Sequence, residues 1–342
     1  MISLSPSSLS LNPIFLSPSF FPNQAHAHPF NGAPLSFLSP AKPFFLTKTN
    51  IPNHSTFSAN SATVQQQQGT EEKEEEEEED FRVLTAIQSE FNQILILESE
   101  TSKILLLDDT GSVHSILYKT QKWTNSYWDE HCSLPAIIPE GPIAIFGLGG
   151  GTVAHQLLEF WPRLVIDGWE LDQVLIDQAR MFFGLSELEM KGGGDGGGGI
   201  LRVRVGDALS PAATVDGGYA GIMVDLFANG KVLPELEVAQ TWVDMKEKLM
   251  PNGRIMVNCG AATTEVSAEE MKWEVNLTIK ALCEAFGDEF VNWKRMPMSE
   301  SGNYMAFTGP LPDLDLWSDS VPEKLSSTVK LWSPCKPVSG LV

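Results

Sequence analysis

Three glycines at alternate positions, Gly147, Gly149 and Gly151, separate an apolar run of strand length from a helical pattern. A glycine loop at such a junction lets the backbone approach a ligand closely. The N-terminus of the following helix also favours a polar or anionic group. The loop therefore predicts a nucleotide or nucleoside ligand, although an ordinary glycine turn would give the same pattern.

An acidic residue stands at the carboxyl end of each of the next three expected strands. These residues are Glu170 after "RLVIDGW", Asp207 after "ILRVRVG" and Asp225 after "YAGIMV". Ligands of open α/β sheets bind outside the carboxyl ends of the strands. We expect Glu170 to accept hydrogen bonds from ribose hydroxyls and Asp207 to accept one from the adenine amine. Together with the glycines, the three acids predict one nucleoside-binding crevice.

The ligand class follows from the surroundings of these residues. Nicotinamide dinucleotides and S-adenosylmethionine share the glycine loop and the first acid, but "GDAL" after the third strand favours the adenosylmethionine type. The glycine loop contains no Arg or Lys that could bind a pyrophosphate, and an acidic crevice suits a cationic sulfonium. The spacing of His, Cys and acidic residues shows no metal-binding set, so no metal is expected.

The elements that must position these residues alternate along the chain. Four short apolar runs in residues 81–120 predict a small antiparallel sheet, and residues 121–140 form a linking segment. In residues 141–310, strands alternate with helices, which predicts an α/β fold with a doubly wound, Rossmann-like, seven-stranded sheet. The pattern includes expected helices over residues 234–250 and 267–287, a strand over 253–260, and Asp172 as a helix N-cap.

The two ends of the chain have a different composition. Residues 1–70 contain no Asp or Glu and are rich in Ser and Pro, which is typical of a transit peptide, and the scarcity of Arg favours the chloroplast. Residues 71–80 carry nine acids and form a predicted linker. Residues 311–342 form a Pro- and Ser-rich C-terminal tail that wraps the sheet edge or stays loose.

The bulk composition restricts the partners. The formal net charge of −21 and the lack of a basic patch argue against nucleic-acid binding. No apolar run is long enough for a transmembrane helix, so no membrane partner is expected. The four cysteines are far apart in the sequence and are expected to be reduced thiols.

The order of these motifs resembles spermidine synthase and related aminopropyltransferases, which have the class I methyltransferase fold. The resemblance covers about residues 85–310. It rests on the preceding β segment with "SKILLLDD", then "IAIFGLGGGT", "DGWELDQVLIDQAR", "LRVRVGDAL", "YAGIMVDLF" and "LMPNGRIMVN". It implies S-adenosylmethionine or its decarboxylated form as co-substrate, a small-molecule amine or other nucleophile as acceptor, and a possible homodimer.

The resemblance also implies roles for individual residues. Asp225 matches the family's base or anchor for the attacking amine, and Tyr127 and Asp129 match substrate-side positions. Several polyamine-binding acids of the family are missing. Gly150 stands where the glycine loop normally has an acid, and Ala228 stands near the position of a second strand-four acid.

Three hypotheses follow from this pattern. The first is a spermidine synthase-like transferase that moves an aminopropyl or methyl group to an amine or another nucleophile. The second is a methyltransferase acting on a small molecule or a protein, because classical polyamine binding needs the missing acids. The third is a catalytically silent plastid scaffold protein that retains the fold.

Overall fold

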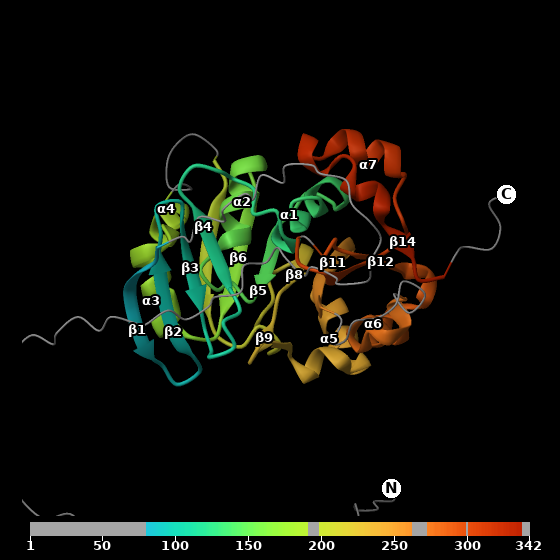
Figure 1. Ribbon diagram of the computed structural model, residues 1–342. Helices are drawn as coiled ribbons and strands as arrows, with labels where there is room; N and C mark the ends of the chain where they lie inside the picture. The colour runs from blue at the N-terminus through green and yellow to red at the C-terminus, as the bar shows by residue number, and fades with distance from the viewer. Residues whose placement is uncertain (1–79, 191–197, 262–271, 299, 337–342) are drawn as a thin grey trace, which may run out of the picture. The chain divides into compact units, whose positions relative to one another are not determined.

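The computed structural model of the protein describes residues 80–190, 198–261, 272–298 and 300–336 (Figure 1). The predicted transit peptide, residues 71–79 of the acidic linker and the first part of the helix expected over 267–287 lie outside these residues. None of the described helices is long and apolar enough to cross a membrane.

The first described elements form the small antiparallel sheet that the sequence predicts. Each strand pairs with its neighbour along the chain, in the order β1-β2-β3-β4. The middle strands are the most buried because their "QILILE" and "SKILL" runs are almost wholly apolar. The strands are β1 (Arg82–Gln88), β2 (Gln93–Glu98), β3 (Ser102–Leu106) and β4 (Ser115–Tyr118).

The central sheet has the strand order β14-β12-β13-β11-β8-β5-β6-β7. The five strands from β11 to β7 are parallel, whereas β13, β12 and β14 pair antiparallel. The strands are β5 (Ile143–Phe146), β6 (Val165–Glu170), β7 (Ile200–Val205), β8 (Tyr219–Val224), β11 (Leu249–Ala261), β12 (Val291–Arg295), β13 (Asn303–Thr308) and β14 (Ser333–Pro334). The predicted doubly wound architecture is confirmed.

Helices supply the two hydrophobic layers that cover this sheet (Figure 1). Side chains of α2 (Thr152–Phe160), α3 (Gln173–Phe182) and α4 (Leu185–Met190) belong to one core cluster. Side chains of α5 (Ala239–Lys246) and α6 (Leu277–Phe286) belong to the other. As predicted, Asp172 caps α3 by accepting hydrogen bonds from two backbone N–H groups.

Two expected helices differ from the sequence prediction. The helix expected over residues 234–250 is a 3₁₀ turn at Pro234–Glu237 followed by α5, and its last residues already belong to β11. The described part of the second expected helix starts with a 3₁₀ turn at Trp273–Val275, after which Asn276 caps α6. Its side chain accepts from Ile279 N and so starts a new helix there.

The sheet has eight strands among the described residues rather than the seven expected, because β14 pairs with β12. Two indoles anchor the C-terminal segment that contains α7 (Leu314–Ser320). Trp317 donates to the carbonyl oxygen of Ser133 at 2.9 Å, and Trp332 donates to Oε1 of Glu130 at 2.8 Å. Glu130 also forms a buried ion pair with Lys294 at 2.5 Å. The described part of the tail therefore belongs to the fold.

Candidate functional site

The parallel register brings the predicted site residues to one edge of the central sheet. Phe146, the last residue of β5, pairs with Trp169 of β6 and with Val224 of β8. Glu170 and Asp225 occupy the last position of β6 and the first position after β8. Because adjacent parallel strands end together, the glycine loop and these two carboxylates converge on the carboxyl edge.

The glycine loop has a backbone conformation that side chains rarely adopt. Gly147, Gly149 and Gly151 have φ angles of +88°, +54° and +88°. A Cβ at Gly147 would lie 2.3 Å from the backbone oxygen of Asp225, so glycine is required there for close packing as well as for conformation. The loop is therefore in direct backbone contact with the segment that carries the candidate catalytic acid.

The carboxylate of Glu170 joins the glycine loop to the start of α3. Its Oε2 accepts from Gly149 N at 3.0 Å, and its Oε1 accepts from Leu171 N at 2.9 Å and Asp172 N at 3.2 Å. Burial raises the pKa of Glu170, and these backbone hydrogen bonds oppose the shift. The structure therefore places Glu170 beside the loop, where a ribose acceptor is expected.

The carboxylate of Asp225 is partly buried and is held from two sides. Tyr127 of α1 (Tyr127–His131) donates its hydroxyl to Oδ2 at 3.1 Å, and Asn258 of β11 donates Nδ2 to Oδ1 at 2.9 Å. Burial raises the pKa of Asp225, while hydrogen bonds from Asn258, Tyr127 and Trp128 oppose the shift. Burial and the neighbouring carboxylate raise the pKa of Tyr127 well above its ordinary range, so its hydroxyl remains a donor.

An amide pair extends this network and was not predicted from the sequence. Oδ1 of Asn258 accepts from Gly260 N at 3.0 Å and from Nδ2 of Asn303 at 2.8 Å. The side chain of Asn258 is thereby fixed with its amide nitrogen toward Asp225. Asn258 lies at the carboxyl edge of β11, where ligands of open α/β sheets bind. The sequence prediction included only ionisable residues at the strand ends, so Asn258 was not part of it.

Gly150 lies against the small sheet. Its backbone N–H donates to Oγ of Ser115 at 2.8 Å. A Cβ at this position would lie 2.9 Å from Cβ of Ser115 and 3.1 Å from the ring of Phe183. The position at which the resemblance implies an acid is thus closely packed here.

Asp207 lies at the same edge but is more exposed to solvent than Glu170 and Asp225. It follows β7, and its Oδ1 accepts from Leu209 N at 2.8 Å, which stabilises the turn after the strand. The side chain is accessible to solvent. Its predicted role in adenine binding remains a prediction.

Asp129 has different surroundings from Tyr127. Its carboxylate accepts from the backbone N–H of Thr124 at 2.8 Å and of Asn125 at 2.9 Å, and from Gln156 of α2 at 2.5 Å. Lys324 forms an ion pair with it at 3.1 Å. These partners join the linking segment, α2 and the C-terminal segment, so the structure places Asp129 in a structural network.

Replacing Asp129 with Ala is expected to lower the free energy of unfolding by about 3–5 kcal/mol, because several donors and one cation lose a buried partner. The rate of any transfer per folded molecule should stay within about twofold. Chemical denaturation followed by single-turnover assays measures both quantities. Asp315→Ala, which removes an exposed acid paired with Lys330, serves as the control. A large loss of rate at unchanged stability would instead assign Asp129 to the substrate side.

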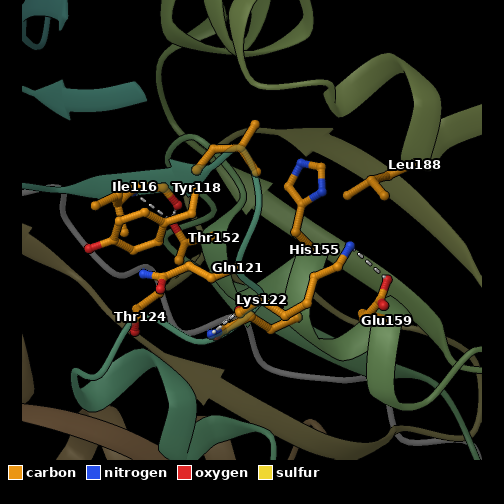
Figure 2. A pocket seen from close by; sticks show the side chains of 11 residues that line it. Ile116, Tyr118, Gln121, Lys122, Thr124, Thr152, His155, Glu159 and Leu188 are labelled. Carbon is orange, nitrogen blue, oxygen red and sulfur yellow. Dashed lines mark hydrogen bonds and ion pairs between the residues drawn. The ribbon is translucent and has the colours of Figure 1, made fainter. Parts of the chain in front are cut away.

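Neither of two small hollows in the structure is lined by the loop glycines or by Glu170, Asp207 or Asp225. One of about 120 Å³ lies between β4, residues 121–124 and α2, with Lys122 and Glu159 paired at 3.3 Å on its wall (Figure 2). The other, of about 130 Å³, includes Leu209 and Lys248. Ligand pockets for nucleoside-sized molecules are several times larger, at roughly 300–1,000 Å³. The convergence of the strand ends therefore remains the better guide to the site.

Within the described ranges, no group of three or more His, Cys, Asp or Glu side chains could hold a metal ion. The polar groups at the carboxyl edge are carboxylates, amides and a phenol. Such a set suits an organic ligand that donates hydrogen bonds or carries a positive charge.

Part of the chain is similar in sequence to two kinds of transferase. No family model matches the chain. A probable polyamine aminopropyl transferase of Bifidobacterium longum is 27% identical over 147 residues, which cover 43% of this chain. The human eEF1A lysine and N-terminal methyltransferase is 27% identical over 138 residues, which cover 36% of it. The chain thus matches 30% and 18% of the lengths of these relatives, and the predicted resemblance is confirmed.

Two solved structures are among those similar to the chain. Spermidine synthase from Thermotoga maritima is 18% identical, with a TM-score of 0.49 and coverage of 71% of this chain and 77% of that one. Human methyltransferase-like protein 13, solved in complex with SAH, is 20% identical, with a TM-score of 0.40 and coverage of 62% and 91%.

Proposed function

We propose that the protein is a spermidine synthase-like transferase that moves an alkyl group from S-adenosylmethionine, or its decarboxylated form, to an amine. The observation that carries this proposal is the contact between the glycine loop and Asp225. The backbone of Gly147 packs directly on that of Asp225, and Tyr127 and Asn258 hold the carboxylate at the carboxyl edge. A nucleoside donor on the loop would thus lie next to an acid that suits a cationic acceptor.

The residues present fit a sulfonium nucleoside. Glu170 and Asp207 would accept hydrogen bonds from the ribose and the adenine, and no basic side chain of the loop repels the positive sulfur. Asp225 and Tyr127 would anchor the acceptor amine. Alkyl transfer from a sulfonium needs mainly alignment of the nucleophile with the carbon that it attacks. Positioning by this rigid edge therefore supports the proposed reaction.

The packing at Gly150 favours methyl transfer as the second candidate. In the aminopropyltransferases an acid at this position contacts the amino end of the transferred group, as the resemblance implies. Here a Cβ at this position would lie 2.9 Å from Cβ of Ser115 and 3.1 Å from the ring of Phe183. A methyl group has no amino end to bind, so methyl transfer does not need that acid.

A ligand titration tests the proposal. We expect S-adenosylmethionine or its decarboxylated form, at about 100 times its dissociation constant, to raise the melting temperature by about 5–10 °C. Methylthioadenosine should raise it as well, because it retains the nucleoside. Glu170→Ala should weaken all three shifts, whereas Asp244→Asn, at an exposed acid of α5, should preserve them.

Product mass analysis with putrescine and spermidine as acceptors then separates the candidates. An aminopropyl adduct supports the first candidate and a methyl adduct the second. Nucleoside binding without transfer to any acceptor would favour the silent scaffold. No shift with any of the three ligands would contradict both transferase candidates.

The remaining predictions concern the location of the protein in the cell and its partners. The composition of residues 1–70 supports import into the chloroplast, which a fusion of residues 1–80 to a fluorescent protein would test. The acidic charge supports a small-molecule acceptor rather than nucleic acid. The possible homodimer remains a prediction from the resemblance.

A further inference from the structure

The chain directly after Asp225 forms a short hairpin at the candidate site (Figure 1). Its strands are β9 (Phe227–Ala228) and β10 (Lys231–Val232), which pair antiparallel. The turn between them consists of Asn229 and Gly230, with φ angles of +51° and +68°. Two positive φ angles are what a tight two-residue hairpin turn requires, and such a turn fixes the register of its strands.

The register gives the hairpin one apolar face beside the amide network. Phe227 pairs with Val232, and cross-strand partners have their side chains on the same face. A Cβ at Gly260 would lie 2.9 Å from Cγ2 of Val232 and 3.8 Å from Cε1 of Phe227. The backbone N–H of Gly260 donates to Asn258, whose amide in turn donates to Asp225. The two apolar side chains therefore lie beside the network that holds the carboxylate.

The residue between Asp225 and Phe227 adds apolar surface on the side of the donor loop. Cδ2 of Leu226 would lie 3.2 Å from a Cβ at Gly147. Asp225, Leu226 and Phe227 are all partly exposed to solvent. An acceptor bound to the carboxylate of Asp225 would thus have apolar side chains on two sides.

The charge of Asp225 is balanced differently from that of two acids on α1. Glu130 forms an ion pair with Lys294 at 2.5 Å, and Asp129 forms one with Lys324 at 3.1 Å. The phenol and the amide that donate to Asp225 are neutral groups. Each carboxylate oxygen has two lone pairs, so both can accept a further hydrogen bond. Of these three acids, Asp225 is the one whose charge is available to an ammonium group.

The next charged residue along the chain after Asp225 is a cation. Lys231 pairs with Ala228 in the hairpin, and both residues are exposed. Where the resemblance implies a second acid, this chain thus has a small apolar residue beside a positive charge. A second ammonium of a bound polyamine would meet apolar side chains or a cation there, and an ammonium that loses its hydration without a counter-charge is costly.

We propose that the acceptor is an amine with a single positive charge and an apolar body, rather than a polyamine. This inference rests on the proposed function and specifies the substrate class of the same site. The ammonium would bind to Asp225, and the apolar body would contact Leu226 and Phe227. Phe227 then determines the specificity for the acceptor, because its ring offers no counter-charge to a second ammonium.

The transfer step balances without a further reactant. The bound ammonium gives one proton to the carboxylate of Asp225, and the electron pair of that N–H bond stays on nitrogen. The neutral amine then attacks the carbon bonded to the sulfonium. The C–N bond forms as the C–S bond breaks, and the electron pair of the C–S bond goes to sulfur. The products are an alkylated ammonium and a neutral thioether, and the proton on Asp225 leaves to solvent.

The direct test compares n-butylamine with putrescine, which have the same carbon chain and differ by one ammonium group. Both are fully protonated at neutral pH. With saturating donor, kcat/KM for n-butylamine should exceed that for putrescine by about 10–100-fold, because the second ammonium loses hydration without gaining a partner. Phenethylamine, with its larger apolar body, should react at least as well as n-butylamine. Equal values for n-butylamine and putrescine, or a preference for putrescine, would overturn the inference.

Variants of Phe227 test its role in this preference. Phe227→Glu should raise kcat/KM for putrescine relative to n-butylamine by about tenfold, because the new carboxylate can pair with the second ammonium. Phe227→Leu keeps an apolar side chain and should retain the wild-type preference. An unchanged ratio in Phe227→Glu, with donor affinity equal to that of the wild type, would overturn the role of Phe227. The comparison of amines on the wild type does not depend on the folding of this variant.

Phe290→Glu is the matched control. Phe290 is 44% exposed and precedes β12, whose first residue pairs with the last residue of β13. Since β13 runs antiparallel to β11, this end of β12 lies at the opposite edge of the sheet from Asp225. The same change of charge should therefore leave the preference between the two amines unaltered. A shift as large as that of Phe227→Glu would show that net charge, and not the position of the carboxylate, sets the preference, and would overturn the inference.

Donor binding and amine binding separate this inference from the proposed function. If the wild type binds the donor but alkylates no amine, the proposed function fails and the inference fails with it. If it alkylates putrescine or spermidine in preference to monoamines, the inference alone fails. Calorimetric titration of amines onto the protein saturated with methylthioadenosine gives a result that does not depend on turnover. There n-butylamine should bind more tightly than putrescine, and the reverse order would overturn the inference.

Discussion

Replacing Asp225 with Asn is expected to lower the rate of transfer by about 10²–10⁴-fold while donor affinity stays within about twofold. The amide keeps the shape of the side chain but loses the negative charge that would anchor a cationic amine between Tyr127 and Asn258. Donor affinity should persist because the glycine loop and Glu170 do not depend on that charge. Single-turnover kinetics with saturating donor, combined with calorimetric titration of the donor, measures the two effects.

The stability of the same variant should depend on pH. Burial raises the pKa of Asp225 above its ordinary value of 3.8, so ionisation of the carboxylate destabilises the folded state. This cost is absent below pH 3.8 and grows as the pH rises through the folded-state pKa. As the pH rises from 3.8, the free energy of unfolding of the wild type should therefore fall relative to that of Asp225→Asn. The opposite slope, or an unchanged transfer rate, would contradict the role given to Asp225.

Replacing Gly147 with Ala is expected to abolish donor binding and to lower the free energy of unfolding by at least about 2 kcal/mol. Its φ of +88° alone costs a non-glycine residue roughly 1–2 kcal/mol. The new Cβ would also lie 2.3 Å from the backbone oxygen of Asp225, so the loop must move. Since the loop carries the proposed donor site, a thermal-shift titration should show a lower melting temperature and no response to S-adenosylmethionine.

Gly217→Ala separates the cost of the positive φ from the steric clash of the new Cβ. Gly217 has a φ of +82°, and a Cβ there would have no neighbour within 4 Å. It should therefore lose stability through conformation alone and retain the full ligand response. If the two variants lose the same stability and both still respond to the donor, close packing of the loop on Asp225 is unimportant for binding.

Most of the fold could be predicted because the strands are short, apolar and separated by clear turn residues. The exceptions have local causes. Residues 249–250 continue a helical pattern, but their backbone joins β11 beside β8, so tertiary pairing outweighs helix propensity there. The start of α6 is set by the side chain of Asn276, and a capping residue within a long polar pattern is easily missed. The pairing of β14 with β12 depends on distant contacts of Trp332.

One rule was enough to predict part of the candidate site from the sequence. Strand ends in a parallel sheet share an edge, so Glu170 and Asp225 could be placed together from the sequence. The partners of Asp225 could not all be found in this way, because Asn258 and Asn303 carry no charge and belong to strands of opposite direction. Asp129 matched a family position, yet its partners come from residues far along the chain, such as Gln156 and Lys324.

The buried pair between Glu130 and Lys294 has a consequence for local unfolding. Glu130 lies on the same short helix as Tyr127, and Trp332 of the C-terminal segment donates to the same carboxylate. An opening of the C-terminal segment would leave that carboxylate without one of its donors, so α1 and this segment should exchange their amide protons as one cooperative unit. The hydrogen bond from Tyr127 to Asp225 would then last only as long as the C-terminal segment stays folded.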